Sequence, residues 1–451
     1  MELMEPQQAE SQLDKVSALL RSGRLNPVRQ LLKALTPGEI AHLLESMPPN
    51  QRKLVWGLVD SDVSGDVLVE LGEEARAGLI EGMGTGELLD ATEGMETDDL
   101  ADLVQTLPET ITEELLKRMT FSDRQRLESV LAYDEDTAGG LMNTDTVTVR
   151  SDVTIDVVLR YVRARGELPD HTDALMVVNR FGYYLGTLPL TRLVTSDASR
   201  TVEEVMDKEA PAIPADTPKS EVASIFEKRD LVSAAVVDDA GRLLGRITID
   251  DVVDVLRDEA GHNLLSHAGL NEEDDIFAPV IPCTQRRAVW LGVNLLTALL
   301  ASWVIGQFQD TLQKVVALAV LMPVVASMGG IAGTQTLTLV IRGLALDQVT
   351  RDNRGWLLFK ELAVGFLNGL IWAAVVAWIS ILWFGDYQIG AIIAAAMVIN
   401  MLVAALAGVT IPLVLRSLSI DPALAGGVVL TTITDVIGFL VFLGLATIFL
   451  R

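Results

Sequence analysis

Five long stretches without a charged side chain dominate the second half of this 451-residue chain, and only Asp435 interrupts the last of them. Each exceeds the roughly 20 apolar residues with which a helix crosses the hydrocarbon core of a bilayer. Buried helices of a soluble domain are the alternative, but five in succession make that a poor explanation. The sequence therefore predicts a five-helix transmembrane domain, with spans at 288–309, 315–341, 362–385, 387–415 and 422–450.

The charge of the chain divides at Cys283. Residues 1–283 hold 54 of the 61 acidic and 26 of the 35 basic side chains, a net charge of −28, whereas residues 284–451 carry a net charge of +2. This division excludes a simple soluble enzyme, a disordered protein and a nucleic-acid binder that acts through a basic surface. The single cysteine and the charged N-terminus indicate no disulfide framework and no signal peptide, so we expect the acidic half in the cytoplasm.

Basic side chains lie in the connections at one end of the predicted spans. They precede the first span, join the second to the third and join the fourth to the fifth, at Arg286, Arg287, Arg342, Arg351, Arg354, Lys360 and Arg416. Because basic residues favour the cytoplasmic side, we expect a multi-pass protein of the cell (inner) membrane, with the lipid bilayer as a partner. Its N-terminus would be cytoplasmic and its C-terminus outside.

Two features of the apolar half indicate an ion path. Asp435 lies in mid-span, where a carboxylate is costly unless it meets a partner or a watery passage. The second span contains Pro323 and then the small residues 327–335, which indicate either close helix packing or a broken helix whose carbonyls face a cavity. Freed carbonyls, Gln335 and Asp435 would form an oxygen lining suited to hydrated Mg²⁺. A hydrogen bond from Asp435 to a neighbouring helix is the structural alternative.

Residues 140–260 contain an internal repeat. Gly186 corresponds to Gly245, and each copy reads strand, helix, apolar strand, glycine turn, strand, helix. This order resembles a tandem pair of CBS domains, a sensing module that binds adenosine nucleotides or ions. In such domains the pattern Gly245-x-x-Thr248-x-x-Asp251 can hold a ribose, so Asp251 is a candidate ligand of a nucleotide or of Mg²⁺. A purely structural pair is the alternative.

The N-terminal region is expected to be all-helical, because apolar residues recur at spacings of three and four. Two similar helices stop at Pro48 and Pro108, which indicates a superhelix of repeated hairpins. A connector between the repeat and the first span would be either a helix that transmits movement or a passive linker. The predicted parts are an acidic helical N-terminal domain (1–135), tandem CBS domains (136–260, about 136–200 and 201–260), a connecting plug helix (261–284) and the transmembrane domain (285–451).

Acidic side chains gather on two predicted helices, at Asp98 and Asp102 and at Asp251 and Asp254. A solvated helix face is the usual meaning of such runs, since like charges at this spacing repel by a few tenths of a kcal/mol. The net charge of −28 favours a second interpretation, in which divalent cations bridge acidic faces that otherwise repel one another. Ion concentration would then control how compact the acidic half is.

The order of these parts resembles the MgtE family of magnesium channels across essentially the whole chain. The segments that carry the resemblance are Tyr133–Met142, Gly329-Gly330-x-x-Gly333-x-Gln335, Asp421-Pro422-Ala423 and Thr434-Asp435. The resemblance implies a homodimeric, Mg²⁺-selective, channel-like importer that is not an enzyme. It also implies Mg²⁺ as both substrate and regulator, because Mg²⁺ bound to the acidic N-terminal and CBS domains closes the pore. ATP at the CBS pair is left open.

The resemblance also assigns roles to single residues. Asp435 would hold hydrated Mg²⁺, Glu361 and Gln335 would lie by the pore, and the backbone around Gly329 and Gly330 would line it. The implied cytosolic sensor residues are Asp98, Asp102, Asp251, Asp254, Glu259 and Asp421.

Several residues depart from the family pattern. Amides or acids would be expected at Ile331, Ala405, Gly427, Lys228, Arg229 and His262. Asn400 is a nearby amide for the pore. The departures leave open a transporter of Mn²⁺, Co²⁺ or Ni²⁺ with weakened gating, although one cysteine and no histidine in the spans disfavour a soft-metal site. An intramembrane aspartyl protease is disfavoured, because Asp421 and Asp435 differ in depth and the sequence has no Gly-x-Gly-Asp motif.

Overall fold

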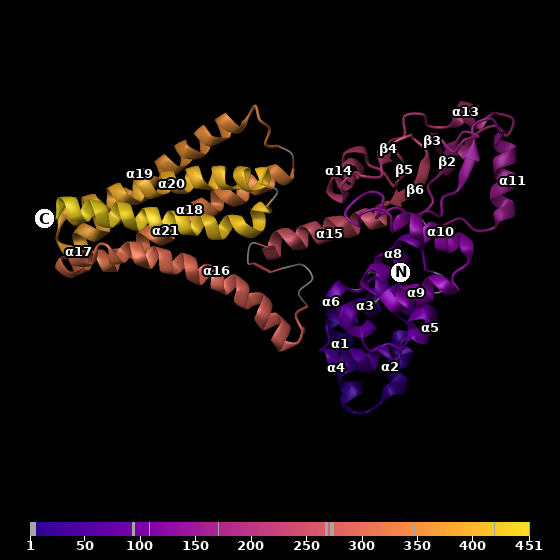
Figure 1. Cartoon of the computed structure of the whole chain (residues 1–451), viewed down its shortest axis with the longest axis horizontal. Coiled ribbons are helices and arrows are strands. Elements are labelled where there is room, and N and C mark those ends of the chain that lie inside the picture. The colour runs from indigo at the N-terminus through magenta and orange to yellow at the C-terminus, as the bar shows by residue number, and fades with distance from the viewer. Residues whose placement is uncertain are drawn as a thin grey trace. The chain divides into compact units, whose positions relative to one another are not determined.

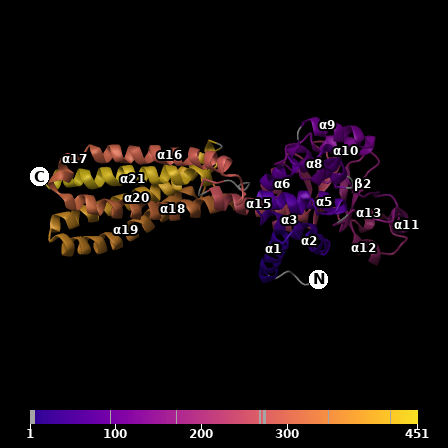
Figure 2. The same ribbon diagram turned by 90° about the horizontal axis from the view of Figure 1, so that it is seen from below.

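The computed structural model divides the chain into two compact units. One consists of Met1–Gly261 and Glu273–Pro279, and the other of His262–Glu272 and Val280–Arg451. Figures 1 and 2 show their helices and strands. Pro108, expected to end a helix, and residues 271–274 of the expected connector lie outside the described residues. The structure describes residues 6–92, 95–107, 109–169, 171–266, 269–270, 275–346, 348–418 and 420–450.

The N-terminal part of the first unit is all-helical, as predicted. Helices two apart in sequence pack against each other, such as α3 with α5, α5 with α7 and α8 with α10, which is the arrangement of a superhelix of hairpins. Their apolar faces are fully buried at Ile40, Leu44 and Leu103. Across the described residues the helices are α1 (Pro6–Arg21), α2 (Leu25–Leu32), α3 (Pro37–Glu45), α4 (Pro49–Trp56), α5 (Ser61–Val69), α6 (Glu73–Ile80), α7 (Thr85–Ala91), α8 (Thr97–Thr106), α9 (Glu109–Arg118) and α10 (Phe121–Val130).

Two three-stranded sheets confirm the internal repeat. In each sheet the first strand pairs in parallel with the second, and the second pairs antiparallel with the third. Val177 faces Gly186 and Val236 faces Gly245, at equivalent register positions of the two copies. The elements are β1 (Thr148–Arg150), α11 (Ile155–Arg165), β2 (Ala174–Val178), β3 (Tyr184–Pro189), α12 (Leu190–Thr195), α13 (Val202–Val205), β4 (Ala212–Pro214), α14 (Lys219–Arg229), β5 (Ser233–Val237), β6 (Leu243–Thr248) and α15 (Ile249–Ser266).

The N-terminal helices share a hydrophobic core with the second CBS copy, whereas the first copy has a core of its own. The Tyr133–Met142 segment forms this junction: the Gly139 N–H donates to the Ala215 carbonyl at 2.8 Å. A Cβ at Gly139 would lie 2.3 Å from the Tyr133 ring, so only glycine fits there. This joint packs the N-terminal domain against the second CBS copy, from which α15 continues with several predicted sensor residues.

Among the residues that the structure describes in the second unit, five helices are long and apolar enough to cross a membrane, which confirms the predicted spans. In Figures 1 and 2 they lie side by side, and α20 packs against α18, α19 and α21, while α16 packs on α21. A short helix, α17 (Gln309–Lys314), joins the first two spans. The spans are α16 (Val280–Gly306), α18 (Val316–Ala345), α19 (Arg354–Phe384), α20 (Tyr387–Ser417) and α21 (Pro422–Phe449).

Two local features differ from what the sequence suggested. Helix α18 is unbroken through Pro323, so of the two interpretations of its small residues the structure shows close packing and not a broken helix. The region expected to form a connecting helix over 261–284 contains the end of α15 and the start of α16. The described residues between them, 269–270 and 275–279, are not helical. Helix α15 instead runs without a break from the second CBS copy to Ser266.

Candidate ion path and acidic cluster

A cavity of about 540 Å³ lies beside Asp435 in the membrane unit. Asp435 itself is half-buried, and within the described residues the structure shows no hydrogen bond or ion pair for its carboxylate. The cavity therefore brings together three predicted pore residues, Gly330, Gln335 and Asp435. The remaining lining comes from the same two helices, α18 and α21, at Ala326, Ser327, Ile331, Thr334 and Thr431.

A second cavity of about 540 Å³ contains Glu361 of α19. This carboxylate is only 4% exposed, and it accepts hydrogen bonds from Thr336 Oγ1 at 3.1 Å and from Lys360 Nζ at 2.5 Å. Gln335 and Ile331 line both cavities. Glu361 is thus a buried acid that is paired with Lys360. Its cavity and the cavity of Asp435 are neighbours that share Gln335 and Ile331.

Gly329 is not among the residues that line these two cavities; it packs instead against Asn400 of α20. Asn400 is 1% exposed, and its Nδ2 donates to the Val325 carbonyl of α18 at 2.9 Å. A Cβ at Gly329 would lie 2.2 Å from Asn400 Nδ2, and one at Gly438 of α21 would lie 2.9 Å from it. Gly329 adjoins Gly330 and Gly438 is one turn from Asp435, so Asn400 is packed between the two helices that line the Asp435 cavity and is hydrogen-bonded to one of them, α18.

The Gly329 contact predicts a position-specific loss of stability. We expect Gly329→Ala to push α18 away from α20 and to destabilise the membrane unit by about 1–3 kcal/mol, as overpacking does. Gly330→Ala is the matched control, because a Cβ there meets no atom within 4 Å. Thermal unfolding in detergent should therefore show a lower melting temperature for the first variant than for the second. Equal melting temperatures would contradict the packing role.

In the first unit the structure brings Asp98 of α8 close to Asp251 of α15. Asp98 is 8% exposed, and its buried Oδ1 has no hydrogen-bond partner among the described residues. Burial, followed by the charges of Asp251 and Asp99, raises the pKa of Asp98 well above its usual range. Burial and the charge of Asp250 raise the pKa of Asp251 to about 7, although its Oδ2 accepts hydrogen bonds from the Thr248 N–H and hydroxyl, each at 3.2 Å.

Other acids surround this pair. Burial and the charge of Glu96 raise the pKa of Asp99 to about 7. Asp102 is exposed, and its charge is among those that raise the pKa of Asp99. Asp254 is exposed and pairs with Arg257, 3.2 Å away, and its charge adds to the burial that raises the pKa of Glu70.

The last two predicted sensor residues lie elsewhere. Glu259 is partly buried and has an interaction of its own further along α15. Asp421 belongs to the second unit, where it caps α21 by accepting from the Ala423 N–H at 2.9 Å. His262 Nε2 lies 2.9 Å from the other carboxylate oxygen of Asp421. The structure therefore places His262, where the resemblance led us to expect an acid, beside Asp421.

The donor set of the cluster fits a hydrated cation better than a bare one. Within the described ranges, no three His, Cys, Asp or Glu side chains converge closely enough to hold a metal ion directly. Mg²⁺, however, keeps several waters and binds proteins through one or two carboxylates. The unpartnered, buried oxygen of Asp98 beside Asp251 supplies such a pair. These residues fit Mg²⁺ held through its water shell.

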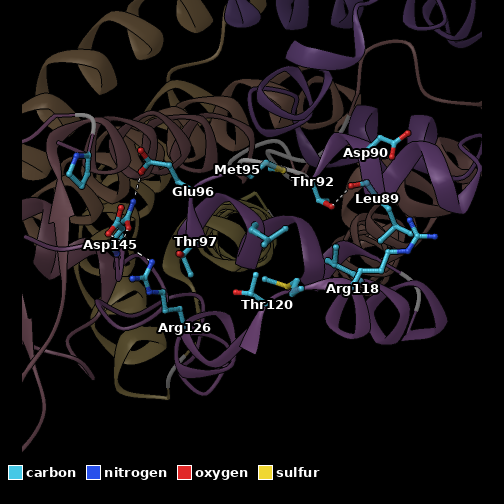
Figure 3. A pocket seen from close by; sticks show the side chains of 15 residues that line it. Leu89, Asp90, Thr92, Met95, Glu96, Thr97, Arg118, Thr120, Arg126 and Asp145 are labelled. Carbon is cyan, nitrogen blue, oxygen red and sulfur yellow. Dashed lines mark hydrogen bonds and ion pairs between the residues drawn. The ribbon is translucent and has the colours of Figure 1, made fainter. Parts of the chain in front are cut away.

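A cavity of about 680 Å³, shown in Figure 3, lies between α7–α10 and the start of the first CBS copy. Arg126 Nη1 lies 3.9 Å from Asp145 Oδ1, and Asn143 donates a hydrogen bond to Glu96. The charge of Glu96 in turn raises the pKa of Asp98 and Asp99, which links this cavity to the acidic cluster. These residues could not be identified from the sequence, because separate segments supply the lining of the cavity and no motif joins them.

The raised pKa values of the cluster predict a pH dependence. A carboxyl group whose pKa is higher in the folded than in the unfolded protein destabilises the fold as pH rises through that interval. For Asp99 and Asp251 the interval runs from the ordinary aspartate pKa of 3.8 to a pKa of about 7 in the folded protein. In chelator, thermal unfolding of the full chain should therefore occur at lower temperature at pH 8 than at pH 5. The double variant Asp99→Asn/Asp251→Asn should lose most of this difference, and an unchanged difference would contradict the assignment.

Comparisons with known proteins agree with this architecture. Three family profiles match the chain: the divalent cation transporter domain MgtE over residues 322–445, the MgtE intracellular N domain over 35–136 and the CBS domain over 202–258. The solved structures that resemble it include the cytosolic domain of the Mg²⁺ channel MgtE in complex with ATP. That structure is 29% identical, with a TM-score of 0.49, and the match covers 54% of this chain and 99% of that one.

Curated relatives match over nearly their whole length. The magnesium transporter MgtE of Thermus thermophilus is 30% identical over 439 residues, which cover 96% of this chain and 97% of the relative. The magnesium transporter MgtE of Bacillus subtilis is 28% identical over 437 residues, which cover 97% of both. These relatives are transporters, in agreement with the expectation that the chain is not an enzyme. Together with the helical domain, the CBS pair and the five spans, this similarity shows that the chain belongs to the MgtE family of magnesium transporters.

Proposed function

We propose that this protein is a channel-like importer of Mg²⁺ whose path passes Asp435. The observation that carries the proposal is the half-buried Asp435 carboxylate, which lines a cavity in mid-membrane and has no protein partner among the described residues. A charge held in this way is a functional site by default, because the membrane interior makes it costly. A hydrated dication supplies the positive charge that the protein does not.

The membrane potential suffices to drive this transport. Two charges that cross 100 mV gain roughly 4.6 kcal/mol. The sequence contains no Gly-x-x-x-x-Gly-Lys-Ser/Thr motif for nucleotide hydrolysis. With the N-terminus in the cytoplasm and the C-terminus outside, the acidic domains face the side that Mg²⁺ enters, so they can respond to the imported ion.

A homodimer completes the passage in this proposal. The cavity beside Asp435 is lined by α18 and α21 alone, and two helices do not enclose a pore. Closed two-fold symmetry is the commonest way in which a chain supplies the missing wall from a second copy. The passage would then lie on the two-fold axis, with one Asp435 from each subunit.

Cytosolic Mg²⁺ closes the pore in this proposal. At high Mg²⁺ the ion bridges the acidic faces and makes the N-terminal and CBS domains compact. At low Mg²⁺ the raised pKa values of Asp98 and Asp251 reflect repulsion and desolvation that favour separation. The proposed sensor residues are those implied by the family pattern: Asp98, Asp102, Asp251, Asp254, Glu259 and Asp421.

The choice among divalent cations depends on residues that differ from the family pattern. Ile331 lines both membrane cavities, and Ala405 lines the one with Glu361. Competition flux tests the proposal: entry of Mg²⁺ into proteoliposomes is measured with and without Mn²⁺, Co²⁺ or Ni²⁺ at equal concentration. Mg²⁺ entry that persists supports Mg²⁺ selectivity. Preferential entry of a competitor supports the alternative cargo, and absence of any divalent flux rejects the function.

ATP is a proposed additional ligand of the CBS pair. Asp251, the acid of the ribose pattern, already binds Thr248 and lies close enough to Asp98 to raise its pKa. ATP and Mg²⁺ would therefore use the same carboxylate. Calorimetric titration of the full-length protein with ATP should show binding that Asp251→Ala abolishes, and no binding to the parent protein would reject this ligand.

A further inference from the structure

The segment that precedes the first membrane helix is fastened to the N-terminal domain by a buried ion pair. Arg52 Nη2 of α4 lies 2.7 Å from Asp275 Oδ2, and the two side chains are 4% and 10% exposed. The Asp275 N–H donates to Glu74 Oε2 of α6 at 2.8 Å, and the Phe277 N–H donates to Asp275 Oδ1 at 2.9 Å. Residues 275–279, named the strap here, therefore belong to the first unit by their contacts.

Arg52 is built into the N-terminal domain independently of the strap. Its Nε donates to the Leu44 carbonyl at 3.0 Å and its Nη2 to the Met47 carbonyl at 3.3 Å, at the end of α3. A buried guanidinium needs a carboxylate, because an unpaired buried charge is strongly destabilising. That carboxylate comes from Asp275, 223 residues further along the chain. The domain thus depends on the strap for the counter-charge of a buried cation.

The strap is short, so a displacement of Asp275 is passed along only a few residues to α16. Four residues separate Asp275 from Val280, the first residue of α16. Five residue steps of extended chain span at most about 17 Å. The chain therefore keeps the start of the first membrane helix within about 17 Å of Asp275, and the ion pair, while intact, fastens that end of the strap to Arg52 of the N-terminal domain.

We propose that the strap is a second link through which the N-terminal domain controls the membrane domain, by a direct pull on α16. This inference rests on the proposed Mg²⁺-controlled pore. When Mg²⁺ makes the acidic domains compact, the N-terminal domain moves with the strap attached, so its movement reaches α16 without passing through α15. Arg52 and Asp275 are positioning residues for closure and do not contact the transported ion.

Substitution of the strap carboxylate tests the link. Asp275→Asn retains an oxygen acceptor for the Phe277 N–H and removes the charge that pairs with Arg52. We expect the cytosolic Mg²⁺ concentration that halves flux in proteoliposomes to rise at least threefold, and the flux at low Mg²⁺ to stay within twofold of the parent. An unchanged or lowered half-inhibitory concentration in a folded variant would overturn the proposal.

Lys33→Ala is the matched control, because Lys33 pairs with Asp60 at 2.9 Å in the same domain but both side chains are exposed. It should leave the half-inhibitory concentration unchanged. If the parent protein itself shows no Mg²⁺ flux or no closure, the proposed function fails, and that outcome is separate from failure of the strap.

Hydrogen–deuterium exchange gives a readout that does not depend on transport. In the full-length protein, Asp275→Ala should speed exchange of the Phe277 amide, whose acceptor it removes, and Arg52→Lys should also speed it by loosening the strap. Lys cannot reproduce the fork of hydrogen bonds made by Arg52. Slow exchange at Phe277 in the Arg52→Lys variant would show that the pair does not hold the strap, and would overturn the proposal.

Discussion

Mg²⁺ flux through the reconstituted protein is expected to fall at least a hundredfold when Asp435 is replaced by alanine. At an effective dielectric constant of about 20, a carboxylate and a dication about 6 Å apart attract by about 5.5 kcal/mol. A hundredfold loss corresponds to about 2.7 kcal/mol, well within that attraction. Since Asp435 has no hydrogen-bond partner among the described residues, its loss should leave folding and dimerisation intact. Flux by a Mg²⁺-sensitive dye and size-exclusion chromatography measure the two effects.

Asp310→Asn is the control for Asp435→Ala. Asp310 is an exposed acid of α17 in the same unit, and it does not line the Asp435 cavity. Its substitution should leave flux within about twofold of the parent. A folded Asp435→Ala protein that retains flux within about threefold of the parent would remove Asp435 from the ion path.

Loss of closure is the expected result of the double substitution Asp98→Asn/Asp251→Asn. The change removes the two carboxylates that lie close together at the junction of the N-terminal domain with the second CBS copy, and with them the ligands through which Mg²⁺ would bridge the acidic faces, while the remaining acids Asp99 and Asp250 still repel each other. The cytosolic Mg²⁺ concentration that halves flux should rise at least tenfold, while flux at low Mg²⁺ stays near that of the parent. Flux titrations in proteoliposomes measure both.

The control for this pair is Asp152→Asn, which removes an exposed carboxylate that pairs with Arg150 in the first CBS copy. It should not change closure. If the double variant closes at the same Mg²⁺ concentration as the parent, the acidic cluster is not the sensor, even if the pore assignment holds.

The broad architecture could be predicted from the sequence because its signals are local or periodic. Charge-free stretches define the five spans, and equivalent glycines of the repeat, Gly186 and Gly245, occupy equivalent register positions in the two sheets. The free-energy cost of a carboxylate in the middle of a membrane span identifies Asp435 as a candidate site, and the structure places this residue at a cavity. The small residues of α18 were compatible with two structures, and the packed one is observed because Asn400 and Leu430 occupy the space beside Gly329 and Gly333.

The contacts that depend on tertiary structure could not be predicted. The sequence suggests Asn400 as an amide near the pore, but only the structure shows it buried between α18 and α21. The Arg52–Asp275 pair joins residues 223 positions apart, and each looks like an ordinary surface charge in the sequence. Neither depends on a motif or a period. These contacts form only when surfaces that are distant in the sequence come together in the fold. No local pattern in the sequence indicates which surfaces meet.

The most direct test of the account is ionic current in excised patches of membrane that contain the purified protein, with Mg²⁺ varied separately at each face. The account predicts an inward Mg²⁺ current that grows as the face with the acidic domains becomes more negative. Added Mg²⁺ at that face should abolish the current, and added Mg²⁺ at the other face should increase it. A protein that carries no Mg²⁺ current, or whose current responds equally to Mg²⁺ at both faces, would contradict the account.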